Sequence, residues 1–304
     1  MSPVAKARRP RAGTKDAAQT PRRPGRSSPR PRVVVETRVS QLAAPKLLEW
    51  VADVEEAIPR VLASSDGEAV HDLRVALRRI RSLLRLVRRV FGGFHVNLIR
   101  RELARVADAT GSLRDEEVLE KTLDALDVDA RTGKVLSPWK TRRRQRLKAL
   151  QTSVIALLRS GALLAPLAHL RALLSLPCDP ERDREVRRFA RQAVLEAQAY
   201  VDECRGVEVD DVAGMHVLRI AYKRLRYSID AFAPVLPPEL RAWRDVATRF
   251  QSLLGDMHDL DVAVEVIRRT SAIAPAPRAV IVTALQKQRD DLATRYLESA
   301  NLPA

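Results

Sequence analysis

The chain has 304 residues, 46% of them hydrophobic, which is enough for one large domain or two smaller ones. Its net charge is +16, and 45 of its 54 basic residues are arginines, whose planar fork of donors suits phosphate and carboxylate groups, so we expect an anionic partner. The chain has only two cysteines, Cys178 and Cys204, which argues against a disulfide framework. Its polar N-terminus argues against a secretory signal, and no apolar stretch is long enough for a membrane span. We therefore expect a soluble cytoplasmic protein.

Residues 1–32 are the first segment, and they combine six prolines and ten basic residues with a single acid, Asp16. Such a composition cannot bury enough apolar surface to offset the entropy of ordering, so we predict a disordered basic tail. The tail could be a solubilising extension or a weak electrostatic aid to anion binding. Without its charge of +9, the other 272 residues carry only +7, so the arrangement of their charges is a better indicator of anion binding than their sum.

From residue 33 onward the apolar pattern is that of amphipathic helices, and no segment shows a convincing strand pattern. We expect helices at about 42–58, 70–90, 97–109, 112–131, from 137 onward, 162–174, 180–204, 211–236, 239–254, 256–271 and 275–300. The expected breaks are marked by two adjacent glycines at 92–93, by a glycine followed by a polar residue at 111–112 and at 255–256, and by the prolines at 177 and 180. The class is all-α, with two antiparallel four-helix bundles at residues 33–176 and 177–304.

The helix at 70–90, VHDLRVALRRIRSLLRLVRRV, has one strongly cationic face. At 100° per residue, an arc of roughly 80° holds His71, Arg74, Arg78, Arg81 and Arg85. The opposite side would face a core, and it holds Leu73, Ala76, Leu77, Ile80, Leu83, Leu84 and Val87. Like charges three and four residues apart each cost roughly 0.2–0.5 kcal/mol, so this pattern needs an explanation outside the helix.

The same pattern returns at 215–232, MHVLRIAYKRLRYSIDAF. Its cationic arc holds His216, Arg219, Lys223 and Arg226, and its apolar side holds Leu218, Ala221, Leu225, Ile229 and Phe232. His71 and His216 are 145 residues apart, and the segments GSLRD and GDMHD, at 111 and 255, are 144 apart. We interpret this conserved order as an internal duplication.

Two explanations remain open for the cationic faces. Carboxylates on neighbouring helices could neutralise the arginines, with Asp115, Glu117, Asp259 and Asp261 as the candidates. Alternatively, an extended polyanion could lie along them, because His71 to Arg85 spans about 21 Å at 1.5 Å per residue. We favour a mixture in which acids orient some arginines and the anion binds the others. Other cations that could join are Arg101, Arg105, Arg143, Arg146, Arg188, Arg191 and Arg249.

Catalytic signals are poor, because the sequence has no P-loop, no nucleophile elbow and no zinc-binding His-Glu-x-x-His helix. We therefore expect no enzyme activity and no cofactor or metal. Nucleic acid is the main alternative ligand, although aromatic residues make up only 4% of the chain and offer few platforms for stacking bases. The two histidines could be buried hydrogen-bonding residues or could become charged beside a polyphosphate.

The two motif segments, each followed by its Gly-x-x-x-Asp segment, resemble the CHAD family, the conserved histidine α-helical domain, over about residues 39–297. The resemblance implies two pseudo-symmetric four-helix bundles around a basic channel that binds inorganic polyphosphate. It assigns binding to two motif sets, His71, Arg74, Arg78, Arg79 and Arg81 in the first, and His216, Arg219, Lys223, Arg224 and Arg226 in the second. Arg85 aligns with Asp230, so the far ends of the two cationic faces need not be equivalent.

Some members of this family also carry a triphosphate-tunnel domain, but its Glu-x-Glu-x-Lys signature is missing here. The expectation from the sequence is therefore a bacterial, non-catalytic polyphosphate-binding protein, with polyphosphate granules as a candidate partner.

Overall fold

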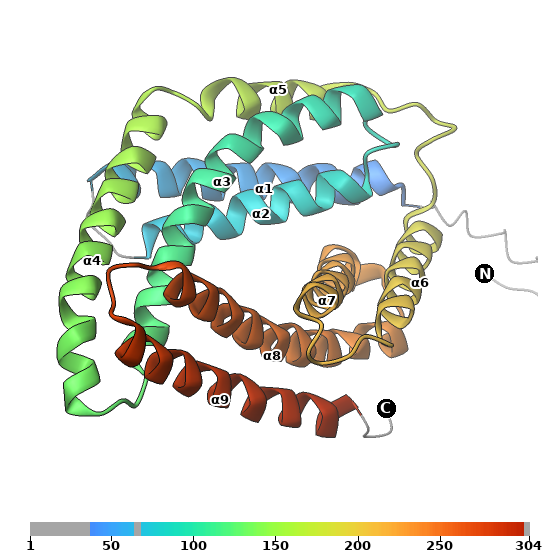
Figure 1. Cartoon of the computed structure of the whole chain (residues 1–304). Helices are drawn as coiled ribbons and strands as arrows, with labels where there is room; N and C mark the ends of the chain where they lie inside the picture. Colours follow the sequence, from blue (N-terminus) through green and yellow to red (C-terminus); the bar gives the residue numbers. More distant parts are fainter. Residues whose placement is uncertain (1–36, 64–67, 301–304) are drawn as a thin grey trace, which may run out of the picture. The chain divides into compact units, whose positions relative to one another are not determined.

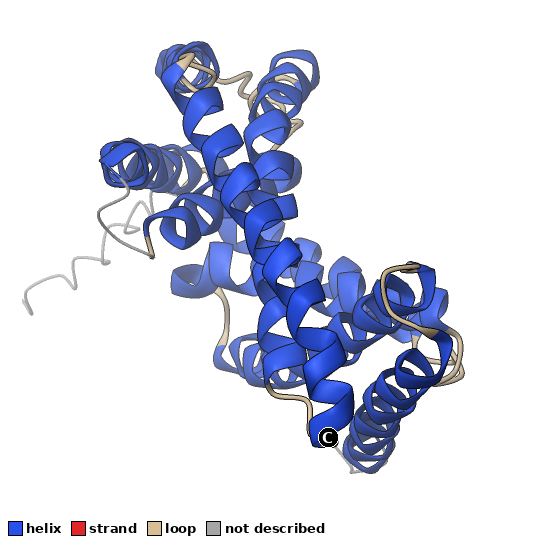
Figure 2. Ribbon diagram, turned by 60° about the vertical axis from the view of Figure 1, so that its left-hand side comes forward, coloured by secondary structure: helices blue, strands red, loops and turns tan. Residues whose placement is uncertain are grey.

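The computed structural model describes residues 37–63 and 68–300, and in these ranges it consists of helices joined by short connections (Figure 1). The described residues contain no β-strand, only one isolated antiparallel bridge between Arg38 and Glu185 (Figure 2). The predicted all-α class is thus confirmed. The predicted tail at 1–32 lies outside the described residues.

The first half of the chain supplies α1 (Val39–Ala63), α2 (Ala69–Leu86), α3 (Gly93–Asp124), α4 (Ala130–Arg159) and α5 (Leu164–Ser175). The second half supplies α6 (Val186–Cys204), α7 (Val212–Phe232), the short 3₁₀ helix η1 (Ala233–Val235), α8 (Pro238–Arg269) and α9 (Pro275–Ala300). α2 packs between α1 and α3, and α7 packs between α6 and α8. The halves meet where α2 contacts α7 and α3 contacts α8.

Two of the expected helix breaks are absent, because Gly111 lies inside α3 and Gly255 lies inside α8. Glycine costs about 1 kcal/mol in a helix interior, which is small beside the apolar burial on both sides of each glycine. Leu103 and Leu113 are buried around the first glycine, and Leu254 and Met257 are buried around the second. The pairs of short helices predicted there are therefore two long helices.

Other predicted helix starts are wrong because side-chain caps act elsewhere. α4 begins at Ala130 and contains Pro138, since the Asp129 carboxylate accepts a hydrogen bond from the Thr132 amide at 2.9 Å. α6 begins after the predicted position, since Glu185 accepts from the amides of Arg187 and Arg188 at 2.8 and 2.6 Å. The predicted start of α4, at residue 137, was therefore too late, and that of α6, at residue 180, was too early.

The connection from α2 to α3 also differs from expectation. α2 ends at Leu86 and is followed by a turn, and Gly92, with φ of 89°, immediately precedes α3. This left-handed backbone conformation favours glycine, which lacks a Cβ. Gly92 therefore starts the next helix instead of closing α2.

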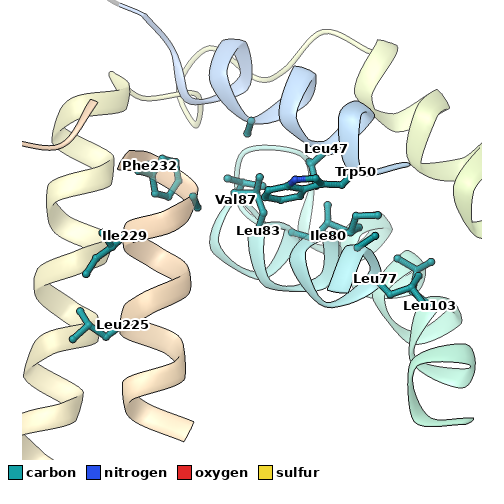
Figure 3. Packing of buried hydrophobic residues seen from close by; sticks show 14 of the residues in the cluster. Leu47, Trp50, Leu77, Ile80, Leu83, Val87, Leu103, Leu225, Ile229 and Phe232 are labelled. Atoms are coloured by element: carbon teal, nitrogen blue, oxygen red, sulfur yellow. The ribbon is translucent and has the colours of Figure 1, made fainter. Parts of the chain in front are cut away.

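The principal hydrophobic core runs through both halves of the described chain, from α1 and α2 to α7 and α8. Figure 3 shows Leu47 and Ile80 where α1 faces α2, and Leu225 and Ile229 where α6 faces α7. A second cluster joins the end of α3 and the start of α4 to α8 and α9. α1–α9 belong to one compact unit, Glu36–Ala304, while the predicted division near residue 177 stays a prediction.

Among the described residues, no single helix has both the length and the apolar character needed to cross a membrane. The bent pair formed by α4 and α5 meets these criteria by length and composition when the two helices are taken together.

Candidate cation cluster between α2 and α7

The two faces predicted for α2 are present in the structure. Its apolar side is buried, with every predicted position, from Leu73 to Val87, at 2% exposure or less. On the other side Arg74, Arg78, Arg81 and Arg85 are partly buried, whereas His71 and Arg79 are exposed. Four of the six basic residues predicted on α2 thus lie at an interface between helices.

The second motif helix, α7, begins at the predicted aspartates, because Asp211 accepts a hydrogen bond from the Gly214 amide at 3.0 Å. Its predicted apolar residues are all buried, at 1% exposure or less. Its basic residues are all partly buried, and they are His216, Arg219, Lys223, Arg224 and Arg226.

Cations from the two helices meet around Tyr227 of α7. The Arg78 guanidinium carbon lies 5.7 Å from the centre of this ring and that of Arg226 lies 4.7 Å from it. Such contacts are favourable because the ring face carries negative charge. One arginine comes from α2 and the other from α7, so Tyr227 marks the place where the two motif copies meet.

Lys223 lies in the middle of this group. Burial, and after it the positive charges of Arg78, Arg219, Arg74 and Arg226, lower its pKa from 10.5 to about 8. We call these five residues, Arg74, Arg78, Arg219, Lys223 and Arg226, the central cation cluster. Both motif copies contribute to it.

A second group of cations continues from the central cation cluster toward the end of α2. Burial lowers the pKa of Arg85, and the charges of Arg224 on α7 and Arg100 on α3 add to this effect. Burial also lowers the pKa of Arg100, with Arg81 as its strongest charged neighbour. Three helices, α2, α3 and α7, therefore bring arginines together here.

Several polar atoms in these two groups are buried without a hydrogen-bond partner among the described residues. They are the Nε atoms of Arg78, Arg81, Arg100 and Arg224 and the hydroxyl of Tyr227. A buried polar group without a partner costs on the order of 1–3 kcal/mol, and more when it is charged. The arrangement is therefore costly in the free protein and could be stabilised by acceptors from outside.

In the described ranges, none of the four predicted carboxylates forms an ion pair with a motif arginine, although the charges of Asp115 and Glu117 act on Arg74 and Asp259 interacts with Arg219 at longer range. Glu117 pairs with Arg114 at 3.3 Å, and Asp261 pairs with Arg289 at 3.1 Å. Within residues 37–63 and 68–300, the only motif residue with an ion pair is Arg226, whose guanidinium lies 3.6 Å from Asp230.

That ion pair explains the difference between the far ends of the two cationic faces. Asp230, the counterpart of Arg85, also accepts a hydrogen bond from Arg244 at 2.6 Å. The Nε of Arg226 donates to Gln251 at 2.7 Å. The end of α7 is therefore internally compensated, whereas the end of α2 keeps uncompensated cations.

The two repeated glycines receive the first arginine of each motif. A Cβ on Gly111 would lie 3.8 Å from the Arg74 guanidinium, and one on Gly255 would lie 3.7 Å from the Nε of Arg219. Arg74 also donates a hydrogen bond to the carbonyl of Thr110. Each glycine thus lies beside the first arginine of one motif. The two contacts correspond to each other, which agrees with the proposed duplication.

The two motif histidines have different surroundings. His71 is exposed, whereas the Nδ1 of His216 lies 3.3 Å from the Nδ1 of His258 on α8. Burial, together with the neighbouring Arg219 and His216, lowers the pKa of His258 from 6.5 to about 4. In the alignment of GSLRD with GDMHD, His258 takes the place of Arg114, but with this pKa it is uncharged at neutral pH in the free protein.

The additional candidate cations do not join the central cation cluster through any contact that the described residues make. Arg143 pairs with the buried Glu116 at 2.5 Å, and Arg146 lies 3.5 Å from the same carboxylate. Arg249 is exposed and packs over Phe250 at 5.3 Å. The remaining candidates are exposed on α3 and α6, and they are Arg101, Arg105, Arg188 and Arg191.

Comparisons with known proteins match this architecture. The crystal structure of the CHAD domain from the plant Ricinus communis superimposes with a TM-score of 0.70 at 22% identity, covering 88% of this chain and 94% of that one. PptA from Streptomyces chartreusis superimposes with a TM-score of 0.63 at 20% identity, covering 88% of this chain and all of that one. At these identities the likeness concerns the fold.

Sequence similarity extends to an uncharacterized protein, Rv2226, of Mycobacterium tuberculosis, which is 31% identical over 255 residues. The alignment covers 79% of this chain but 48% of that protein, so the chain spans about half the length of this relative. The family model of the CHAD domain matches residues 46–268, a range that contains α2, α7 and all five residues of the central cation cluster. The chain belongs to the CHAD domain family.

Proposed function

We propose that this protein binds inorganic polyphosphate along the facing sides of α2 and α7, without chemical transformation of the ligand. The observation that supports the proposal is the central cation cluster, in which two repeated helices hold partly buried cations, and among the described residues only Arg226 of this cluster forms an ion pair with a carboxylate. A run of phosphates would supply an acceptor to each guanidinium fork and remove the mutual repulsion.

The length of the cationic face favours a chain over a single phosphate. From Arg74 to Arg85 the α2 axis rises roughly 16 Å, and partly buried arginines lie along all of it. A compact anion would satisfy one part of this face and leave the other arginines uncompensated. A linear polyanion can contact them all.

The aromatic rings near the cluster favour polyphosphate over nucleic acid. Single-stranded nucleic acids usually stack their bases on open aromatic faces. Here arginines lie against Tyr227, and Tyr222 is 2% exposed and stacks on Phe250 with the ring centres 5.0 Å apart. These rings support the cations and are not open platforms for bases.

The test is a quadruple variant, Arg74→Ala, Arg78→Ala, Arg219→Ala and Lys223→Ala, in the full chain. The control removes an equal number of positive charges at exposed sites elsewhere, through Arg159→Ala, Arg187→Ala, Arg241→Ala and Arg295→Ala. The basic tail is identical in both, so its contribution cancels. Circular dichroism checks that the helices remain folded.

The readout is the affinity for long-chain polyphosphate as a function of salt concentration. By analogy with single-stranded nucleic acids, each neutralised phosphate contributes about 0.7 to the slope of log K against log salt. We expect the quadruple variant to lower this slope by up to about 3, and the control variant to lower it much less. An unchanged slope, or equal losses in both variants, would refute the proposed site.

Two companion measurements separate the alternatives. Competition by RNA at matched charge should displace polyphosphate poorly, and a preference for RNA would instead favour a nucleic-acid-binding function. Incubation with polyphosphate should release no free phosphate if the protein only binds. Recruitment to polyphosphate granules in a bacterial cytoplasm is part of the same proposal, and the quadruple variant should lose it.

A further inference from the structure

Beyond the central cation cluster, the structure contains a basic pocket at the end of α2 that sequence reasoning did not single out. It has a volume of about 850 Å³ and is formed by the end of α2, the following turn, the segment before α6 and one face of α6. Its charged lining consists of Arg85, Arg88, Arg89, Arg182 and Arg184 with Glu181 and Glu196.

These arginines are largely available to a ligand. Arg88, Arg89 and Arg184 are exposed, and their side chains form no ion pair within the part of the chain that the structure describes. Arg182 is held by Asp179 at 3.1 Å, and Glu196 accepts a hydrogen bond from Gln192 at 2.8 Å. With five arginines and two glutamates, the lining has a net charge of +3.

Arg85 belongs both to the pocket and to the second group of cations, which lies on α2, α3 and α7. Its side chain lines the pocket, and the charges that act on it are those of Arg224 on α7 and Arg100 on α3. Arg88 in turn acts on Arg100. On α2, Arg78 of the central cation cluster is followed at helical spacing by Arg81 and Arg85, so basic residues follow one side of α2 from its contact with α7 to the pocket.

We propose that this pocket is a second subsite for the same linear polyanion, which only chains longer than the central cation cluster can reach. This inference rests on the proposed function and adds a chain-length dependence to it. A short polyanion fills the contact between α2 and α7. A long one continues past Arg85 and is also bound by Arg88, Arg89 and Arg184, so both subsites contribute to its affinity.

The test replaces the exposed pocket arginines in the full chain, through Arg88→Ala, Arg89→Ala and Arg184→Ala. The matched control removes three exposed arginines that do not line the pocket, through Arg159→Ala, Arg187→Ala and Arg241→Ala. Both variants are titrated with inorganic tripolyphosphate and with long-chain polyphosphate at one salt concentration.

We expect the pocket variant to bind tripolyphosphate within about twofold of the wild type and long-chain polyphosphate about tenfold more weakly, since three exposed ion pairs each contribute a small factor. The control variant should lose clearly less affinity for the long chain. Equal long-chain affinities in pocket and control variants would overturn the inference, as would an equal loss for tripolyphosphate.

The quadruple variant of the central cation cluster separates this inference from the proposed function. If that variant keeps wild-type affinity for both ligands, the proposed function itself fails. If it loses both ligands while the pocket variant behaves like its control, the central site stands and only the second subsite is refuted.

Discussion

Replacing Lys223 with methionine should make the free protein more stable while weakening its binding of polyphosphate. Lys223 lies among cations from both motif helices, and burial together with their charges lowers its pKa from 10.5 to about 8. Because one pKa unit corresponds to about 1.36 kcal/mol, keeping this ammonium charged in the folded state costs about 3 kcal/mol. Methionine preserves most of the side-chain volume and removes the charge.

The sign of the pH dependence follows from the same pKa. Below about pH 8, Lys223 is protonated in both the folded and the unfolded protein, so the full cost is present. Between about pH 8 and 10.5 the unfolded chain binds more protons than the folded one, so the free energy of unfolding rises with pH. The contribution of Lys223 is therefore a destabilisation at neutral pH that disappears toward pH 10.5.

The assay is urea denaturation of wild type, Lys223→Met and the exposed-site control Lys148→Met at pH 7 and pH 9.5. At pH 7 we expect Lys223→Met to raise the free energy of unfolding by about 1–3 kcal/mol, the lower values allowing for local relaxation. The gain should shrink at pH 9.5, and Lys148→Met should change little at either pH. A destabilised variant, or a gain that is independent of pH, would refute the reasoning.

Three further outcomes are expected. Affinity for polyphosphate should increase as the pH falls from 7 to 5, because a bound polyanion raises the low pKa of His258. Calorimetry in buffers of different ionisation enthalpy should show proton uptake on binding, and His258→Gln should reduce this uptake. Tyr227→Phe removes a buried hydroxyl without a partner, so thermal unfolding should show no loss of stability. Asp211→Ala removes the cap of α7 and should cost about 1 kcal/mol in urea denaturation, with Asp245→Ala, an exposed site within α8, as the neutral comparison.

The helical class and the two motif faces were determined by the sequence itself. Apolar residues three and four apart identify the buried side of α2 and α7, because a helix presents such positions on one face regardless of what packs there. Leu77 and Leu225 are buried as that periodicity predicts. The start of α7 at Asp211 also followed from local chemistry, since an N-cap involves only neighbouring residues.

Only the tertiary structure decided where helices continue and which charges meet. Gly111 and Gly255 look like breaks locally, but the packing of α3 and α8 outweighs the small cost of glycine and turns both sites into contacts for arginines. Ion pairing likewise depends on the distances between helices, and the spacing of residues along one helix does not give these distances. Sequence alone could not show that Asp230 compensates Arg226 while Arg85 stays unpaired and faces a pocket, because these partners meet across the fold.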